Sequence, residues 1–276
     1  MDWTDPGAVL ARLQQNAGVA ALGLVGTPGY GVPVLRDPLV IDPGLPGAAE
    51  ALRRAAIKIE GEPGPGNLIV LDRDTVTRGL VVELKGKQGN LLLLGGPQQL
   101  IKGRLRLSGH HNAVVLGASG KTSLTLTMTL RAQHSLLFVG DGVTCGGAHI
   151  WLEGEATSVA LGEDGMLATE IWLRTADGHG IIDLETGRQT NPPRSILLEP
   201  HVWLGQEVLV MPGVRIGAGS IVGARAVVTK PVPRHCVAAG IPARVIRRGA
   251  SWTRSALPGP DQVGAVVATL REEVEA

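Results

Sequence analysis

The sequence of 276 residues contains few aromatic residues and few cysteines: one Phe, one Tyr, five Trp and two Cys. This scarcity argues against a large aromatic cage and favours a narrow core filled by aliphatic side chains. The two cysteines, Cys145 and Cys236, lack the close pairing of a zinc knuckle or a redox motif. We therefore predict that both are reduced thiols and that the protein binds no metal through them.

Neither sign of charge dominates, and long apolar runs are missing. The chain has 26 basic and 25 acidic residues, a formal net charge of +1 and no long basic run, so it lacks the electrostatic footprint of a nucleic-acid-binding protein. It has no stretch of about 18 apolar residues and no basic-then-apolar leader. We expect no nucleic-acid or membrane partner, no membrane span and a cytoplasmic location.

Glycine, in contrast, is abundant, with 39 residues, and from Ile196 onward an aliphatic residue recurs at every sixth position. The repeated aliphatic residues are Leu198, Leu204, Val210, Ile216, Val222 and Val228. Small or β-branched residues precede them by two positions, at Val202, Val208, Val214, Ser220 and Ala226, and glycine follows at Gly205, Gly217 and Gly223. Six residues make one short strand and one corner, so this period predicts a mainly β fold, a parallel β-helix with stacked inward aliphatic residues.

A longer coil is predicted upstream, where an aliphatic-Gly pair recurs at spacings of 22, 23 and 22 residues. The pairs begin at Leu94, Leu116, Val139 and Leu161. The six-residue step continues through Val139, Cys145 and Trp151, and again through Leu161, Leu167 and Leu173, which we expect to face inward. Arg106 and Thr122 interrupt the step. The remaining residues fall in polar segments that we interpret as one enlarged corner per coil: 85–90, 108–112, 131–135 and 153–158. An ordinary β-sandwich is the alternative, but it has no reason to keep a six-residue period.

The two ends of the chain lack the repeat. Asp5 and Pro6 predict the start of a short helix over 8–15, and 47–58 predicts a second helix. We expect this N-terminal region to cap the open end of the β-helix, where strand edges are otherwise unpaired. Near the C-terminus, 261–274 predicts a helix that packs outside the coils. The expected division is 1–66 for the cap, joined through a linker at 61–67, then 67–250 for the β-helix and 251–276 for the C-terminal tail and helix.

The repeat fails between Leu173 and Ile196, which predicts a loop that leaves the coils. Within this loop His179 lies between two glycines, with Asp177 and Asp183 on either side. A histidine beside carboxylates can accept and return a proton near neutral pH. The alternative for His179 is an ordinary solvated loop histidine.

Several motifs in this half of the chain resemble those of the left-handed β-helix acyltransferases, in particular the bacterial enzymes that O-acetylate capsular or other polysaccharides. The motifs are RTADGHGIID at 174–183, Asn191-Pro192, HVWLG at 201–205, VVTK at 227–230 and AGIPARVIR at 239–247. The resemblance is strong over about 171–254, weaker from about residue 91, and absent from the N-terminal region.

This resemblance implies a left-handed β-helix and an acetyl-CoA-dependent O-acetyltransferase, usually a homotrimer with its sites between adjacent subunits, that acts on a carbohydrate acceptor. His179 matches the family's general base, and Asp177 or Asp183 would orient its imidazole. Trp203 matches a tryptophan that lines the cleft and contacts the acceptor or the pantetheine arm, and its alternative is an aromatic residue that fills a corner. Asn191 matches the Asn-Pro step of the family, which sets the loop or contacts the acceptor. The candidates for binding coenzyme A are Gly223, Ala224, Lys230, Arg244 and Arg247. No metal is implied.

The chain departs from the family pattern at Glu199-Pro200, where Gly-Asp is typical, and at Ile241, where Asn is common. Three other functions are alternatives to O-acetyl transfer. A γ-type carbonic anhydrase needs closely spaced zinc-binding histidines, which the seven histidines do not provide: 110, 111, 134, 149, 179, 201 and 235. A noncatalytic β-helix scaffold would not need the histidine loop. A transfer to an amino sugar, or from a longer acyl-CoA, stays open.

Overall fold

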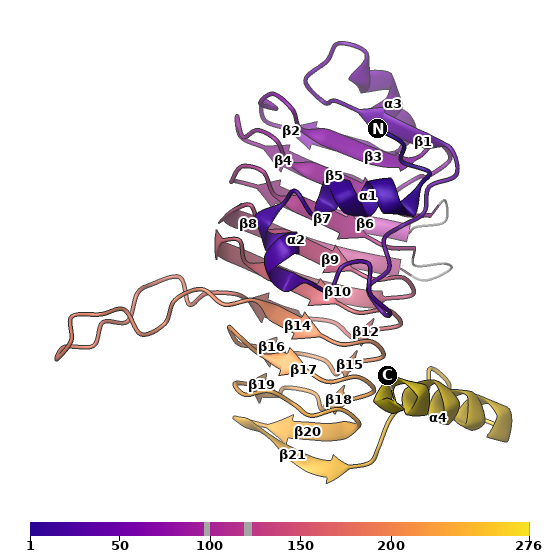
Figure 1. Cartoon of the computed structure of the whole chain (residues 1–276), viewed down its shortest axis with the longest axis vertical. Helices are drawn as coiled ribbons and strands as arrows, with labels where there is room; N and C mark the ends of the chain where they lie inside the picture. Colours follow the sequence, from indigo (N-terminus) through magenta and orange to yellow (C-terminus); the bar gives the residue numbers. More distant parts are fainter. Residues whose placement is uncertain (97–99, 119–122, 276) are drawn as a thin grey trace.

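The structure, a computed structural model, describes residues 1–96, 100–118 and 123–275, and most of this chain coils into a tall β-helix (Figure 1). One strand of each coil contributes to an eight-stranded sheet, called sheet A here. Its neighbours pair in parallel, apart from the antiparallel pair formed by its first two strands. In spatial order the strands are β1 (Pro38–Ile41), β3 (Leu68–Asp72), β5 (Leu91–Leu94), β7 (Ala113–Leu116), β9 (Leu136–Val139), β11 (Ser158–Leu161), β14 (Ile196–Leu198) and β17 (Arg215–Ile216).

The second sheet, sheet B, has thirteen strands and forms the rest of each coil. Its N-terminal part consists of β2 (Ile57–Glu60), β4 (Leu80–Leu84), β6 (Leu100–Leu107), β8 (Ser123–Gln133) and β10 (Thr144–Glu155). Beyond β10 it divides into two rows of shorter strands. One row is β12 (Met166–Leu167), β15 (Trp203–Leu204), β18 (Ile221–Val222), β20 (Cys236–Gly240) and β21 (Ala243–Arg248), and the other is β13 (Ile171–Arg174), β16 (Leu209–Val210) and β19 (Val227–Val228).

The inward positions predicted from the six-residue period form the core. All six repeated aliphatic residues, from Leu198 to Val228, are at most 2% exposed, and so are the five small or β-branched residues that precede them. Each buried aliphatic side chain stabilises the fold by roughly 1.5 to 3 kcal/mol. The parallel β-helix is therefore confirmed, and the β-sandwich alternative is wrong.

The longer coils differ from the prediction in where their extra residues lie. The polar segments 85–90 and 108–112 are corners as expected, but much of 131–135 and 153–158 belongs to the long strands β8 and β10. The pairing of β8 with β10 shifts register between Cys145 and Ala148. Because of this shift Ile150 and Leu152 face the core, and Trp151, which was expected there, lies half-buried on the outside.

Leu167, Leu173 and Cys145 occupy the core as predicted. Arg106 interrupts the six-residue step because it points outward between the buried residues Leu105 and Leu107. Thr122, the other interruption, lies outside the described residues.

A ladder of buried polar residues stacks where the chain turns from sheet B to sheet A. The side-chain oxygen of Asn67 accepts from the backbone N–H of Asn90, that of Asn90 accepts from the N–H of Asn112, and that of Asn112 accepts from the N–H of Ser135, each at 3.0 Å. These bonds satisfy backbone donors that a buried corner would otherwise leave unpaired. The ladder thus defines one straight edge of the β-helix, which we call the B–A edge.

The N-terminal helices lie along the side of the coils. Asp5 caps α1 (Pro6–Leu13) through the N–H groups of Gly7 and Ala8, as the sequence predicted. With α2 (Ala17–Leu22), α1 packs on the outer face of sheet A, in a cluster that includes Val9, Val19 and Phe138 (Figure 1). This part of the expected cap therefore covers a side face of the β-helix.

The end of the coils is closed by α3 (Ala48–Arg54), which buries Ala48 and Leu52 against the core. The predicted helix over 47–58 is wrong at its end, because Ala56 adopts a left-handed conformation at φ 53° and β2 follows at once. β2 pairs in parallel with β4. The coils therefore begin before residue 67.

The C-terminal helix α4 (Pro260–Glu275) confirms the helix expected over 261–274. It projects from the side of the coils (Figure 1) and buries Leu270 beside the corner at Gly219. None of the described helices combines the length and apolar character needed to cross a membrane.

Candidate active site

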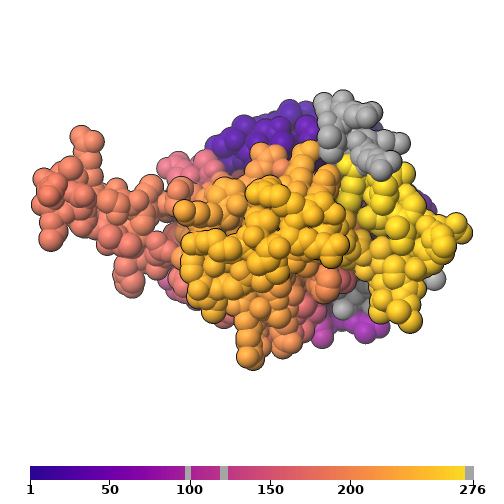
Figure 2. All heavy atoms as spheres, turned by 90° about the horizontal axis from the view of Figure 1, so that it is seen from below, coloured from indigo at the N-terminus to yellow at the C-terminus, as the bar shows by residue number. Residues whose placement is uncertain are grey.

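An arm formed by residues 175–195 leaves the β-helix between β13 and β14, where the repeat fails. It extends far beyond the coils in both views (Figures 1 and 2). Its first residue is held firmly, because the Thr175 hydroxyl donates to the Glu153 carbonyl at 3.0 Å and accepts from the Glu153 N–H at 2.9 Å. Further out, a β-bridge joins Ile182 to Gln189 and keeps the two sides of the arm together.

Asn191 ties the returning side of the arm to the segment that carries His179. Its amide group donates to the Asp177 carboxylate at 2.8 Å and to the His179 backbone carbonyl at 2.9 Å. Its side-chain oxygen accepts from the Ile181 N–H at 2.6 Å. One amide side chain therefore holds the Asp177 carboxylate before His179 and the backbone that follows His179.

His179 lines a small cavity of about 150 Å³ at the root of the arm. The structure brings three of the predicted site residues together there: His179, Asp177 and Asn191. Glu153 and Pro193 also line the cavity, and the sequence analysis did not identify either one. Glu153 could have been identified from the sequence, because it belongs to the polar segment 153–158, which lies on the B–A edge one coil before the arm.

Asp183, the second candidate carboxylate, is engaged elsewhere in the arm. One of its oxygens accepts from the N–H of Thr186 at 2.7 Å, the hydroxyl of Thr186 at 2.9 Å and the N–H of Glu185 at 3.0 Å. The backbone N–H of Thr186, followed by its hydroxyl, holds the pKa of Asp183 below its ordinary value. Asp183 thus stabilises a turn and is not among the residues that line the His179 cavity.

Trp203 lies on β15, in a different row of strands from β13, where the arm begins. Its ring approaches Trp252 with 6.0 Å between the ring centroids. Trp252 also stacks on His201 at 4.3 Å and donates from its indole N–H to the His201 carbonyl. Within one chain Trp203 is therefore absent from the residues that line the His179 cavity.

The predicted coenzyme A residues lie on the last coils, on more than one edge. Gly223 and Ala224 form the corner after β18, stacked on Gly205, where an added Cβ would come within 2.7 Å of the Ala224 nitrogen. Lys230 follows β19 and shares the B–A edge with the arm, whereas Arg244 and Arg247 lie on β21.

The three basic side chains Lys230, Arg244 and Arg247 are exposed, and none of them forms an ion pair with any residue that the structure describes. Their charges are therefore free to meet an anionic ligand.

Glu199 and Pro200, where the chain departs from the family pattern, have structural partners. Glu199 is only 4% exposed and pairs with Arg215 on β17 and with Arg234, which lies between β19 and β20. Burial raises its pKa, but the N–H of Ala218 and the two guanidinium groups outweigh burial, so the pKa lies below its ordinary value. Pro200 packs so closely on Gly29 that an added Cβ there would lie 2.3 Å from the proline ring. At the other departure, Ile241 is exposed and forms a cis peptide bond with Pro242.

Across the described ranges, no three His, Cys, Asp or Glu side chains gather closely enough to hold a metal ion. Both cysteines are free and buried. Burial raises the pKa of the Cys145 thiol to about 12.

Comparison with known proteins supports the resemblance seen in the motifs, although no protein-family model matches the sequence. A polysialic acid O-acetyltransferase of Escherichia coli O1:K1 / APEC is 32% identical over 123 residues, which cover 45% of this chain and 40% of that protein. A galactoside O-acetyltransferase of Escherichia coli K12 is 37% identical over 92 residues, which cover 33% of this chain and 44% of that protein. The chain therefore spans less than half the length of these two relatives.

A solved structure resembles most of the chain in fold. The crystal structure of the polySia specific acetyltransferase NeuO has a TM-score of 0.67 and 26% sequence identity, with 78% of this chain and 99% of that chain covered. In sequence and in fold, this chain is thus related to the left-handed β-helix acyltransferases built from hexapeptide repeats, and bacterial polysaccharide O-acetyltransferases are among its relatives.

Proposed function

We propose that this protein is an O-acetyltransferase that moves an acetyl group from acetyl-CoA to a hydroxyl of a carbohydrate, with His179 as the general base. The observation that carries the proposal is the cavity at the root of the arm, where His179, Asp177 and Asn191 meet. The names of the relatives, which include polysialic acid and galactoside O-acetyltransferases, indicate the reaction class and the kind of acceptor.

The proposed reaction needs one base and no covalent enzyme intermediate. The His179 imidazole removes the proton of the acceptor hydroxyl while that oxygen attacks the thioester carbonyl. The carbon–sulfur bond then breaks, the acetyl group stays on the acceptor oxygen, and the proton on His179 passes to the departing thiolate. Backbone N–H groups directed at the developing oxyanion would supply the main electrostatic stabilisation.

Between the two carboxylates we propose Asp177 as the partner of His179. Asp177 shares the cavity with His179 and is held by Asn191, whereas the Asp183 carboxylate accepts from Glu185 and Thr186 in its own turn. A nearby negative charge stabilises the imidazolium that forms during the reaction. Asn191 acts as a positioning residue, because it bonds the backbone carbonyl of His179 and the N–H of Ile181.

The last coils suit coenzyme A. Lys230, Arg244 and Arg247 offer exposed positive charges, and guanidinium groups bind phosphate oxygens in a bidentate manner. Gly223 and Ala224 provide a corner where a pantetheine arm could approach the backbone closely. When bound, acetyl-CoA supplies the activated acetyl group, and these residues would only hold and orient it.

We further propose a homotrimer in which the arm of one subunit reaches the Trp203 face of its neighbour. The arm exposes Ile181, Ile182 and Leu184, at 58%, 52% and 96%. An extended arm with exposed aliphatic side chains is poorly stabilised in an isolated chain, and contact with a second copy would cover them. Such contact would also bring together two matched residues, His179 and Trp203, that one chain keeps apart.

The first experiment measures thiol release from acetyl-CoA with a panel of neutral and acidic oligosaccharides. We expect acceptor-dependent turnover that falls by about 10² or more in the His179→Ala variant. His110→Asn is the matched control, because His110 lies on the same edge but outside the cavity, and it should retain the parental rate. A parent protein that binds acetyl-CoA without turnover points to another acceptor or acyl donor, and one that does not bind it favours a scaffold role.

The shared site is tested by mixing. His179→Ala and Trp203→Ala chains would each be inactive alone, but a site with His179 from one chain and Trp203 from its neighbour survives in mixed trimers. Random mixing of equal amounts should restore about a quarter of the parental activity. Activity that stays at the level of the separate variants, although sedimentation shows mixed trimers, would contradict a site shared between subunits.

A further inference from the structure

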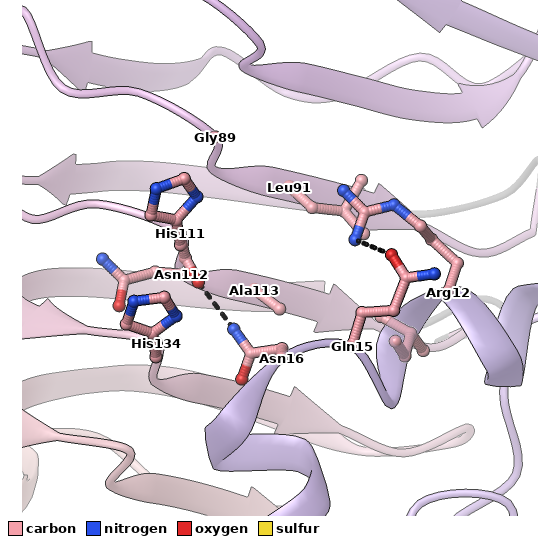
Figure 3. A pocket seen from close by; sticks show the side chains of 10 residues that line it. Arg12, Gln15, Asn16, Gly89, Leu91, His111, Asn112, Ala113 and His134 are labelled. Carbon is pink, nitrogen blue, oxygen red and sulfur yellow. Dashed lines mark hydrogen bonds between the residues drawn. The ribbon is translucent and has the colours of Figure 1, made fainter.

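A second cavity, of about 230 Å³, lies between the two N-terminal helices and the B–A edge (Figure 3). Arg12 and Gln15 line it from the end of α1 and the residues that follow. His111 and His134 line it from two successive corners, and their rings stack with 5.1 Å between centroids and 17° between planes. The N-terminal helices and the coils therefore build this cavity together.

The cavity is positively charged and contains no acidic side chain. None of its lining residues is Asp or Glu, and Arg12 forms no ion pair within the described ranges. Among the residues that the structure describes, its guanidinium donates one hydrogen bond, a long one of 3.3 Å to the neutral Gln15. A guanidinium and two imidazoles without a counter-charge form a binding site for an anionic group such as a carboxylate or a phosphate.

The two asparagines of the cavity, Asn16 and Asn112, already form hydrogen bonds that hold the fold together. Asn16 caps α2 through the Val19 N–H and donates to the His111 carbonyl at 2.6 Å, a bond drawn in Figure 3. Asn112 belongs to the buried ladder. In contrast, the ring nitrogens of His111 and His134 have no recorded hydrogen-bond partner among the described residues, so they are available to a ligand.

This cavity lies on the same B–A edge of the β-helix as the arm that carries His179. The corners that carry His111 and His134, the corner at Ala156 and the arm itself are successive passages from sheet B to sheet A. Neighbouring strands lie about 4.8 Å apart, so the corner of His134 is roughly 10 Å along the axis from the root of the arm. Both features therefore lie on one edge, within reach of a single extended polymer.

We propose that this cavity is a subsite for a carboxylate-bearing sugar of an acidic polysaccharide acceptor. Arg12, His111 and His134 bind the carboxylate, while a hydroxyl further along the polymer reaches His179. The role of the subsite in placing an acceptor rests on the proposed acetyl transfer. The existence of the subsite does not, because it is tested by binding alone.

Two observations favour a sugar carboxylate over a phosphate of coenzyme A. The volume is below the roughly 300 to 1,000 Å³ of sites that enclose larger ligands, which fits a single charged unit. The unpaired basic residues Lys230, Arg244 and Arg247 are on the last coils, far along the chain from this cavity, and already provide candidates for those phosphates.

The test measures binding by calorimetry at pH 6 and low salt, where electrostatic attraction of an anion is screened least. The probes are a sialic acid oligomer, a neutral malto-oligosaccharide of the same length, and coenzyme A alone. The variants are Arg12→Gln and the pair His111→Asn with His134→Asn. Asn tolerates the left-handed conformation of both histidines, at φ 54° and 53°, so the corners should keep their shape.

We expect each variant to bind the sialic acid oligomer about tenfold more weakly, with no change for the neutral oligosaccharide or for coenzyme A. Arg54→Gln, on α3, and His110→Asn are the controls, because both residues lie outside the cavity, and they should bind like the parent. Circular dichroism checks that every variant is folded.

Three results would overturn the proposal: no binding of the sialic acid oligomer by the parent, equal binding by the variants, or a loss confined to coenzyme A, which would assign the cavity to its phosphates. Because the readout is binding, a protein that shows the expected losses but transfers no acetyl group would disprove the proposed function and leave the subsite standing.

Discussion

The two halves of the β-helix both bury a core of aliphatic side chains, but their coils differ in strand length. In the C-terminal half, from β14 to β19, each coil has three strands of two or three residues, and the six-residue period places the inward side chains. In the N-terminal half, sheet B is built from long strands such as β8 and β10, and a bulge at Cys145 shifts the inward positions. A regular repeat thus specifies its core locally, whereas long strands leave the register to pairing between coils.

The halves also differ in what covers them. The N-terminal coils have α1 and α2 on the outer face of sheet A, and the cationic cavity exists only because of these helices. The C-terminal coils carry the arm and the exposed basic residues. Both halves nevertheless share one continuous hydrophobic core and one B–A edge, which is why sites in the two halves can act on one ligand.

The largest expected effect tests whether this core is one unit. Leu116 in a long coil and Leu204 in a short coil are both fully buried. Leu116→Ala and Leu204→Ala should each lower the free energy of unfolding by about 2 to 5 kcal/mol, from lost burial and the cavity left behind. Denaturant unfolding, followed by circular dichroism, measures both.

Leu45→Ala, at a side chain that is 62% exposed, is the control and should change the free energy of unfolding by less than about 0.5 kcal/mol. If one substitution shifted only part of a biphasic transition, the two halves would unfold separately and the picture of one shared core would be wrong.

The next effect concerns the buried carboxylate of the short coils. Glu199→Gln should lower the free energy of unfolding at pH 7 by about 1.5 to 3 kcal/mol, because two arginines lose a charged hydrogen-bond partner. The folded state lowers the pKa of Glu199. Its contribution is therefore complete above the unfolded-state pKa and is lost as the pH falls through the folded-state pKa.

Unfolding of the parent and of Glu199→Gln, compared from pH 7 down to pH 3, should show the difference shrinking. Glu207→Gln is the control, since Glu207 also pairs with an arginine, Arg225, but is exposed. A difference that stays constant with pH would show that Glu199 does not act through its charge.

The matching polar feature of the long coils is the asparagine ladder. Asn112→Ala removes the acceptor for the Ser135 N–H and the donor to the Ala132 carbonyl. It should therefore lower the free energy of unfolding by about 1 to 3 kcal/mol. Gln88→Ala, at an exposed side chain one coil earlier, should leave it nearly unchanged. Equal unfolding curves for the two variants would contradict a stabilising role for the ladder.

The last comparison concerns the two thiols, one in each half, whose substitution is not needed for the test. Both are buried, and burial raises the pKa of Cys145 to about 12. At pH 8 the native protein should react with a thiol reagent at least about a hundredfold more slowly than the denatured protein. Mass spectrometry would identify which thiol reacts, and rapid labelling of native Cys145 would show that the bulge in β10 opens readily.

Much of the fold could be predicted because its pattern is local. The inward residues of the short coils, the helices after Asp5 and before the C-terminus, and the loop at 174–195 all followed from neighbouring residues. The outward position of Trp151 could not be predicted, because it depends on a register shift against β8. The path of the N-terminal helices along sheet A likewise depends on contacts distant in sequence.

For the candidate site, the sequence by itself determined the residue that could act as a base, since His179 stands between glycines where a strict repeat stops. Only the tertiary structure decided that Asp177 shares its cavity, that Asp183 stabilises a turn and that Trp203 lies on another row of strands. It also placed Arg12 in the same cavity as His111 and His134. The physical reason is that a repeat depends on residues close together in the sequence. A site, in contrast, requires groups that only the stacking of coils and the packing of helices bring together.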